Sequence, residues 1–121
     1  MHCPKCEGLM KPVVIEGIEV DRCTACKGLW FDSIEEEQLK SLSVARQIDV
    51  GDVAIGRKLN TRSYVHCPRH TDTLLTRLNV PDQPHIQIES CPACYGTFFD
   101  AGEFTDFTEK TLLESIRAFL Y

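Results

Sequence analysis

The cysteines of this sequence occur in pairs separated by two residues, a spacing that can turn two thiols toward one point. Six of the seven cysteines form C-x-x-C pairs, and the seventh has a histidine at the same spacing. The pairs are Cys3/Cys6, Cys23/Cys26, Cys91/Cys94 and Cys67/His70. Tetrahedral zinc sites use thiolates and imidazoles as ligands. Eight such ligands are enough for two zinc ions.

We predict two structural zinc sites, each built from two of these C-x-x-C or C-x-x-H turns, which we call knuckles. The first site has the spacing C-x2-C-x16-C-x2-C, and the second has C-x2-H-x20-C-x2-C. The predicted ligands are Cys3, Cys6, Cys23 and Cys26 in the first site, and Cys67, His70, Cys91 and Cys94 in the second. Four protein ligands fill the coordination of a zinc ion and leave no position for water or substrate. We therefore expect neither enzymatic activity nor a small-molecule substrate.

Two other chemistries use the same spacing. A C-x-x-C pair can be a thioredoxin-like redox motif, although no βαβ pattern surrounds the pairs in this chain. Rubredoxin-like iron proteins also use two cysteine-rich knuckles, and Cys91–Cys94 resembles one of their loops. Thiolate sites bind iron as well as zinc, so the spacing leaves the identity of the metal open.

A glycine lies two positions after the second cysteine in three of the knuckles. These glycines are Gly8, Gly28 and Gly96. Because glycine has no Cβ, it adopts positive φ without a steric penalty. We therefore expect each of these glycines to provide the positive φ that its knuckle needs.

The chain contains an internal duplication. Residues 2–5, with the sequence HCPK, recur 64 positions later as HCPR, and the CTACKGLWFD segment at 23–32 recurs 68 positions later as CPACYGTFFD. The difference between the two offsets predicts a four-residue insertion in the second copy, which we place in a turn at residues 81–84. Each copy is expected to fold as knuckle, hairpin, knuckle and helix.

Apolar and polar residues alternate between the knuckles, as they do in strands. We expect a first hairpin with Val13 and Ile15 on one strand and Ile18 and Val20 on the other, and a second with strands at 74–80 and 86–88. An Asp-x-x-Glu pattern after each hairpin, at 32–35 and 100–103, predicts a helix start at which both carboxylates bond to backbone N–H groups. The helices are expected at about residues 33–47 and from about residue 101 to near the C-terminus.

The expected fold class is therefore a small, metal-stabilised α+β fold. It consists of two zinc ribbons, each with two knuckles and a β-hairpin and each followed by an α-helix. The expected boundaries are 1–47 for the first ribbon and its helix, 48–63 for a linker with one extended piece, and 64–121 for the second ribbon and the C-terminal helix.

The pattern Cys-Pro-x-Cys, apolar hairpin, Cys-x-x-Cys-x-Gly-x-aromatic-Phe-Asp-x-x-Glu resembles the transcription-factor-type zinc-finger family. These are short zinc ribbons of bacterial type, similar to the ribbon of general transcription factor IIB. The resemblance covers about residues 1–39 and 66–107, and it implies zinc binding, a ribbon fold and a role in transcription. The second copy departs from the pattern at His70, where a cysteine is expected, and at Asp72, where a glycine would follow.

Composition excludes several classes of protein. Hydrophobic residues make up 43% and charged residues 26% of the chain, as in soluble globular proteins. The formal net charge of −5 argues against a protein that coats phosphates non-specifically. We find neither a signal-peptide pattern nor a run of about 20 apolar residues that could span a membrane, so we expect a cytoplasmic protein.

Two surfaces are candidates for macromolecular binding. The preferred hypothesis is a protein–protein adaptor that binds a protein partner, or self-associates, through the apolar face of the C-terminal helix. The residues predicted for that face are Phe107, Leu113, Ile116, Phe119 and Leu120. The alternative is nucleic-acid binding by the basic segment at 57–77, in which an aromatic side chain could stack on a base. Its candidate residues are Arg57, Lys58, Arg62, Tyr64 and Arg69.

Overall fold

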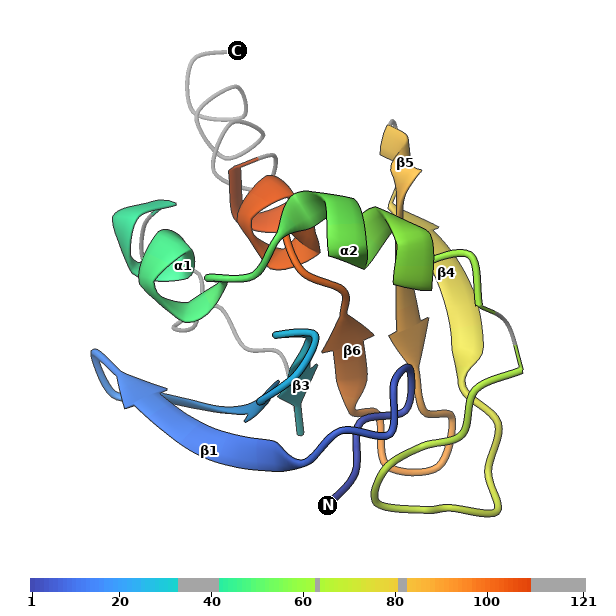
Figure 1. Ribbon diagram of the computed structural model, residues 1–121. Helices are drawn as coiled ribbons and strands as arrows, with labels where there is room; N and C mark the ends of the chain where they lie inside the picture. Colours follow the sequence, from blue (N-terminus) through green and yellow to red (C-terminus); the bar gives the residue numbers. More distant parts are fainter. Residues whose placement is uncertain (33–41, 63, 81–82, 110–121) are drawn as a thin grey trace, which may run out of the picture.

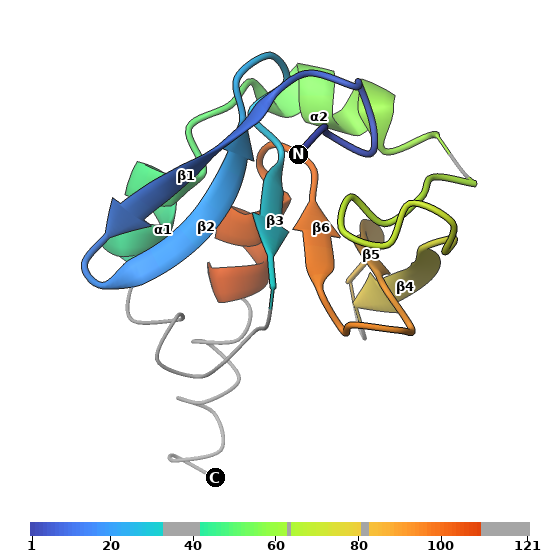
Figure 2. The ribbon, with the colours of Figure 1, turned by 90° about the horizontal axis from the view of Figure 1, so that it is seen from below.

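The structure is a computed structural model, and it describes residues 1–32, 42–62, 64–80 and 83–109. Six antiparallel strands form one sheet in the order β1-β2-β3-β6-β5-β4 (Figures 1 and 2). The strands are β1 (Met10–Ile15), β2 (Ile18–Cys23), β3 (Leu29–Phe31), β4 (Thr76–Val80), β5 (Gln83–Ser90) and β6 (Thr97–Phe99). The two ribbons are therefore parts of a single sheet, and the expected α+β class is confirmed.

The first hairpin forms as predicted. Ile15 pairs with Ile18 across a two-residue turn, in which Glu16 and Gly17 have φ values of 52° and 79°. Positive φ at both turn residues matches the right-handed twist of the flanking strands. Alternation then places Ile18 and Val20 in the core, while Glu19 between them points to solvent.

The second hairpin differs from the prediction in where its extra residues lie. Lys11 pairs with Arg22 in the first copy, and Thr76 pairs with Ser90 in the second. The offsets are thus 65 for the first strand and 68 for the second strand of the hairpin. One inserted residue therefore precedes β4 and only three lie at the hairpin end, where the register shifts between Asn79 and Val80. Placing all four insertions at 81–84 was wrong.

The central strands β3 and β6 were not predicted as strands, and they join the two ribbons. Trp30 pairs with Phe98, Leu29 with Phe99, and Phe31 with Thr97. Trp30 and Phe98 are equivalent positions of the repeat, so an approximate twofold axis passes between them. The two copies meet as the subunits of a symmetric dimer do, each presenting the same strand to the other.

Strand periodicity gives the sheet two small cores, one on each face. Leu29, Phe31 and Phe99 face the helices, where Phe31 and Phe104 have ring centroids 4.7 Å apart. Trp30 and Phe98 face the other way and pack among the cysteines. The cysteines therefore lie on the face of the central strands opposite α1 (Leu42–Ile48) and Phe104, whereas Leu59 of α2 (Val53–Leu59) packs against the cysteine-lined core.

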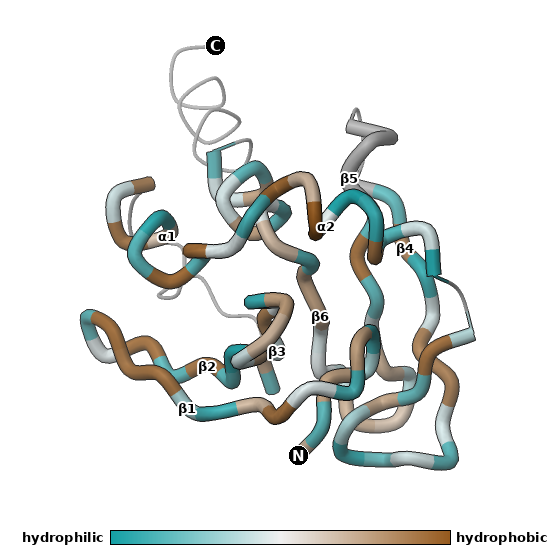
Figure 3. The backbone as a smooth tube through the Cα atoms, in the orientation of Figure 1, coloured by the Kyte–Doolittle hydropathy of each residue, from teal (hydrophilic) through white to brown (hydrophobic). Residues whose placement is uncertain are grey.

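The helices lie together on one side of the sheet (Figures 1 and 2). They are α1 (Leu42–Ile48), α2 (Val53–Leu59) and residues 103–109. Hydrophobic and hydrophilic residues are interspersed along them, as expected for helices with one buried face (Figure 3). Of the predicted first helix, residues 33–41 lie outside the described ranges, as do residues 110–121 of the predicted second. None of the helices within the described residues is long and apolar enough to cross a membrane.

The linker contains a helix, so the predicted extended piece was wrong. Asp52 caps α2 by accepting a hydrogen bond from the N–H of Ala54 (2.8 Å). Gly56 then lets the helix approach the second ribbon, because a Cβ on it would lie 2.1 Å from the carbonyl oxygen of Ala101. Tertiary contact of this kind stabilises a helix too short to persist alone.

Candidate metal centres

The four cysteines of the first ribbon converge. The Sγ atoms of Cys3, Cys6, Cys23 and Cys26 all lie within 4.8 Å of one another. The Sγ–Sγ distances are 3.7 Å for Cys3–Cys26 and 3.4 Å for Cys6–Cys23. Four sulfurs at about 2.3 Å from a zinc ion would be about 3.8 Å apart, whereas a disulfide would hold them at about 2.05 Å. All seven cysteines are free thiols, and this cluster fits a tetrahedral metal ion.

Backbone N–H groups point at the sulfurs of the first cluster. Cys23 Sγ accepts from the N–H groups of Ala25 and Cys26, and Cys26 Sγ accepts from Gly28, each at 3.4 Å. Hydrogen bonding from the Cys3 thiol, helped by the Gly28 N–H, lowers the pKa of Cys26 to about 5. The cluster therefore stabilises the thiolate of Cys26, the form of cysteine that binds metal, whereas hydrogen bonding with Cys26 raises the pKa of Cys3 and burial raises that of Cys6.

The knuckle glycines serve a different purpose from the one predicted. The positive φ lies one residue earlier, at Glu7 (64°), Lys27 (64°) and Tyr95 (63°). Gly28 and Gly96 instead permit close approach, because a Cβ on either would collide with an aromatic ring of the other ribbon. The distances would be 2.3 Å to Phe98 Cζ from Gly28 and 2.1 Å to Trp30 Cζ2 from Gly96.

Three thiols of the second ribbon form a second cluster. The Sγ atoms of Cys67, Cys91 and Cys94 lie within 4.8 Å of one another, and Cys67 and Cys94 are 3.8 Å apart. Burial raises the pKa of the Cys67 thiol to about 11. For Cys91, burial acts in the same direction, but N–H groups of Cys94 and Ala93 oppose it and the pKa of this thiol is lowered.

The ring nitrogens of His70 do not join these three sulfurs. The His70 backbone nevertheless occupies the ligand position of a knuckle, since its N–H donates to Cys67 Sγ at 3.3 Å as that of Cys94 does to Cys91 at 3.5 Å. The loop that follows is one residue longer than in the first copy. The N–H of Cys67 reaches the carbonyl of Thr73, six positions on, whereas that of Cys3 reaches Gly8, five positions on. The inserted residue that precedes β4 lies in this loop.

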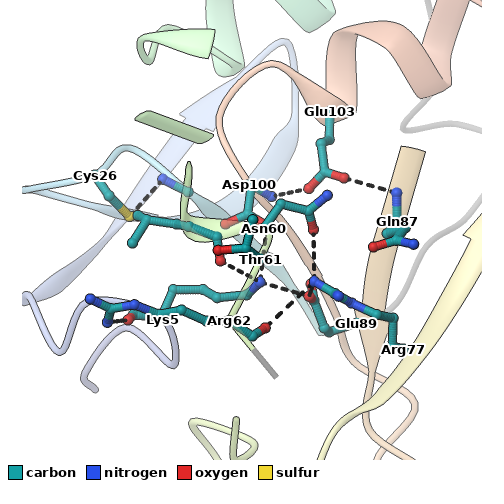
Figure 4. Close-up of polar contacts among 12 residues, drawn as sticks. Lys5, Cys26, Asn60, Thr61, Arg62, Arg77, Gln87, Glu89, Asp100 and Glu103 are labelled. Carbon is teal, nitrogen blue, oxygen red and sulfur yellow. Dashed lines mark hydrogen bonds and ion pairs between the residues drawn. The ribbon is translucent and has the colours of Figure 1, made fainter. Parts of the chain in front are cut away.

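A buried lysine in the first knuckle reaches across to the second ribbon (Figure 4). The side chain of Lys5 is fully buried, and its Nζ lies 2.7 Å from Glu89 Oε1 and 3.1 Å from Asp100 Oδ2. It also donates to the carbonyl of Leu59 at the end of α2 (3.1 Å). Burial raises the pKa of Glu89 and of Asp100, and the Lys5 charge opposes that rise.

An equivalent ion-pair contact runs from the second ribbon to the first. Arg69 is the repeat equivalent of Lys5, and it pairs with Asp21 (Nη2–Oδ2, 3.1 Å) and with Asp32 (Nη2–Oδ2, 2.9 Å). Arg69 Nε donates to the other oxygen of Asp32, so that pair is bidentate. Asp21 and Asp32 are the repeat equivalents of Glu89 and Asp100. Each ribbon therefore places a cation from its first knuckle on the same two positions of the other ribbon.

The helix start at 100–103 is only partly the predicted one. Glu103 Oε1 does accept from the N–H of Asp100 (2.8 Å), but the Asp100 carboxylate is bonded to Lys5. Asp49 from the linker caps the helix instead, accepting from Gly102 N (2.8 Å) and Thr105 N (3.0 Å). Burial, with the Asp100 charge, raises the pKa of Glu103 to about 9.

The residues predicted to bind nucleic acid have different surroundings. Arg57 and Lys58 are exposed on α2, and Tyr64 is 84% exposed. Arg69 is paired as described, and Arg62 donates to the carbonyl of Lys5. Part of the basic segment therefore holds the two ribbons together.

The partner-binding prediction falls mostly outside the described residues. This applies to Leu113, Ile116, Phe119 and Leu120. Phe107 is described, and it is half-buried against Phe99 with ring centroids 5.5 Å apart. Its ring therefore contributes to the core between the helices and the sheet.

Comparison with known proteins identifies the first ribbon. Residues 2–42 match the family model described as transcription factor zinc-finger, the zinc ribbon of the transcription factor IIB type. The second ribbon is supported by its own cysteine cluster. Neither the curated proteins nor the solved structures give a match. The predicted resemblance is thus confirmed for the first copy.

Proposed function

We propose that this protein is a non-catalytic adaptor whose fold is held by two structural zinc ions. The observation that carries the proposal is the first thiol cluster, in which four converging sulfurs provide all the ligands that a tetrahedral zinc ion takes. Cys3, Cys23 and Cys26 are 2%, 0% and 6% exposed and Cys6 is half-buried, so a metal there would be largely shielded from substrate.

His70 is proposed as the fourth ligand of the second site. The His70 N–H donates to Cys67 Sγ as the N–H of Cys94 donates to Cys91 Sγ, and we infer that a different rotamer of the His70 side chain turns a ring nitrogen toward the three sulfurs. Three cysteines and one histidine are a common structural zinc set.

Metal content and cobalt spectra test this coordination. The zinc-loaded chain should contain two zinc ions by native mass spectrometry, and Co²⁺ should give one tetrathiolate and one S₃N spectrum. His70→Ala should weaken metal binding at the second site only, whereas the matched variant His66→Ala should leave both sites unchanged. A red protein that retains iron would instead support the rubredoxin-like alternative.

The adaptor role rests on the family description and on surface composition. The matching family is described as a transcription factor zinc-finger, and we propose a protein partner in transcription. Val50, Val53 and Ile55 in and before α2 are 51%, 44% and 46% exposed. A purified partner should bind the zinc-loaded chain and lose affinity for a Val53→Asp/Ile55→Asp variant that still contains two zinc ions. Equal binding of both would contradict a contact at α2.

Nucleic-acid binding is the second candidate, and Tyr64 favours it. Its exposed ring lines a hollow of about 590 Å³ together with Arg62 and His66, and exposed aromatics can stack on bases. Fluorescent oligonucleotides should then bind with a steep salt dependence. Tyr64→Ala and Arg57→Ser/Lys58→Ser should each weaken that binding. No binding at low salt would eliminate this candidate.

A further inference from the structure

We propose that the two metal sites are thermodynamically coupled, so that metal at one site raises the affinity of the other. This inference rests on the proposed zinc binding and goes beyond it. The carriers of the coupling are the two crossed ion-pair sets, Lys5 with Glu89 and Asp100, and Arg69 with Asp21 and Asp32.

First, each cation of the crossed ion pairs lies in the loop between two predicted metal ligands. Lys5 lies between the ligands Cys3 and Cys6, and Arg69 lies between Cys67 and His70. Metal binding fixes the short loop that carries the cation, because both ends of the loop are tied to the ion. In the metal-free chain that constraint is lost, and the loop can no longer hold its cation against the other ribbon.

The second step is the position of each acid. Glu89 lies two residues before Cys91, and Asp21 lies two residues before Cys23. The cation of one site therefore holds the strand end that delivers a cysteine of the other. Without Lys5, the side chain of Glu89, which is only 2% exposed, would be buried near Asp100 without its closest counter-charge, an unfavourable state for the strand end.

The third step is the packing that accompanies these pairs. Gly28 belongs to a knuckle of the first site, since its N–H donates to Cys26 Sγ, and the ring of Phe98 lies against it. Gly96 belongs to a knuckle of the second site and the ring of Trp30 lies against it. Each ribbon thus supports one metal knuckle of the other with a fully buried aromatic ring.

The functional consequence is a steep response to metal. Coupling between sites in proteins is commonly 5- to 150-fold in affinity, and we expect a factor of about 10 or more here. Because a metal ion at either site raises the affinity of the other, the coupling disfavours the chain with a single metal ion. The shared sheet then forms over a narrower range of zinc concentration than two independent ribbons would need.

The test compares the zinc affinity of each site in the full chain when the other site is intact and when it is disrupted. The affinities are measured under reducing conditions by competition with a chelator, and native mass spectrometry counts the bound ions. Cys91→Ser should weaken the first site, and Cys23→Ser should weaken the second, by the same factor of about 10 or more. Equal affinities with and without the other site would overturn the coupling. If the wild-type chain binds no zinc at all, the proposed function itself fails.

A second variant assigns the coupling to the ion pairs. Arg69 is 44% exposed, so Arg69→Gln should fold, and it should reduce the coupling factor measured with the two serine variants. Arg57→Gln, which removes an exposed cation from α2, is the matched control and should leave the factor unchanged. A factor that is equally large in Arg69→Gln and in Arg57→Gln would overturn the role of the crossed pairs.

Discussion

The two crossed ion-pair sets have equivalent positions in the repeat but very different surroundings. Lys5 and Asp100 have fully buried side chains, whereas Arg69 and Asp32 are 44% and 60% exposed. Burial raises the pKa of Asp100, while hydrogen bonding from Arg69 lowers that of Asp32. The same ion-pair contact is therefore buried on one side of the twofold axis and exposed to solvent on the other.

The linker accounts for part of the difference. It occurs once in the chain, and its helix α2 ends at Leu59, whose carbonyl accepts from Lys5. Arg62, just after α2, donates to the Lys5 carbonyl, so that linker residues cover the lysine. The planar guanidinium group of Arg69 has several N–H donors and can bind two carboxylates and water at once. An exposed position suits that side chain, because its remaining N–H groups stay hydrated.

The largest expected effect comes from breaking the buried set. Lys5→Met should cost about 3–5 kcal/mol of unfolding free energy at saturating zinc, because it leaves two carboxylates buried without their closest cation. Denaturant unfolding of the zinc-loaded protein measures the loss. Adding Glu89→Gln and Asp100→Asn to Lys5→Met should recover part of the stability, since neutral side chains need no counter-charge. No recovery would show that the lysine acts through something other than these charges.

The ring contacts between the ribbons should come next. Gly96→Ala places a methyl group against the buried Trp30 ring and should cost about 1–3 kcal/mol through overpacking. Trp30 is the only tryptophan, so its fluorescence should shift as well. Gly28→Ala should give a similar loss through Phe98 with a smaller change of the spectrum. An unchanged stability and spectrum in Gly96→Ala would contradict the close approach of the two ribbons.

Glu103 allows the buried side to be tested by pH. Its pKa is about 9 in the folded protein, above its ordinary value of 4.5, so the folded state favours the protonated form. That contribution to stability is complete below pH 4.5 and is lost progressively as the pH rises toward 9. Between pH 6.5 and 9, the zinc-loaded wild type should therefore lose stability relative to Glu103→Gln. Glu109→Gln on the exposed side of the same helix is the control, and its curve should run parallel to the wild type.

The smallest effect should come from the exposed set. Arg69→Gln should lower the unfolding free energy by about 1 kcal/mol or less at saturating zinc, because solvent already screens much of this pair. High salt should reduce the loss further. A loss as large as that of Lys5→Met would mean that the two sets are energetically equivalent despite their different exposure.

The sequence predicts the two thiol clusters well because metal coordination requires particular side chains at particular spacings. Seven of the eight predicted ligands fall in the two clusters, and the first hairpin turns between Ile15 and Ile18, as the alternation of apolar residues predicts. His70 was chosen by the same spacing rule, which is insensitive to the extra residue in the following loop. The position of that extra residue follows only from the strand register. The repeated motifs at 66–69 and 91–100 lie on either side of it, and no recognisable motif between them shows where the insertion occurs.

The junction between the ribbons could not be read from patterns of this kind. Leu29–Phe31 and Thr97–Phe99 are too short for periodicity to distinguish a strand from a loop. Their burial on both faces also removes the alternation that marks an amphipathic strand. The signal that could have revealed the junction is the reciprocity of charge, with a cation in each first knuckle and acids at two repeated positions, Asp21/Glu89 and Asp32/Asp100.

The approximate twofold axis also bears on stoichiometry. Two separate ribbons that paired through this strand would dissociate on dilution, whereas the tether in a single chain keeps the effective concentration of one for the other at about the millimolar level. A dimer of identical ribbons would also present every surface twice. Among the described residues, α2 occurs once, so the partner proposed to contact α2 would bind once per chain, and assembly through that surface would end at a one-to-one complex.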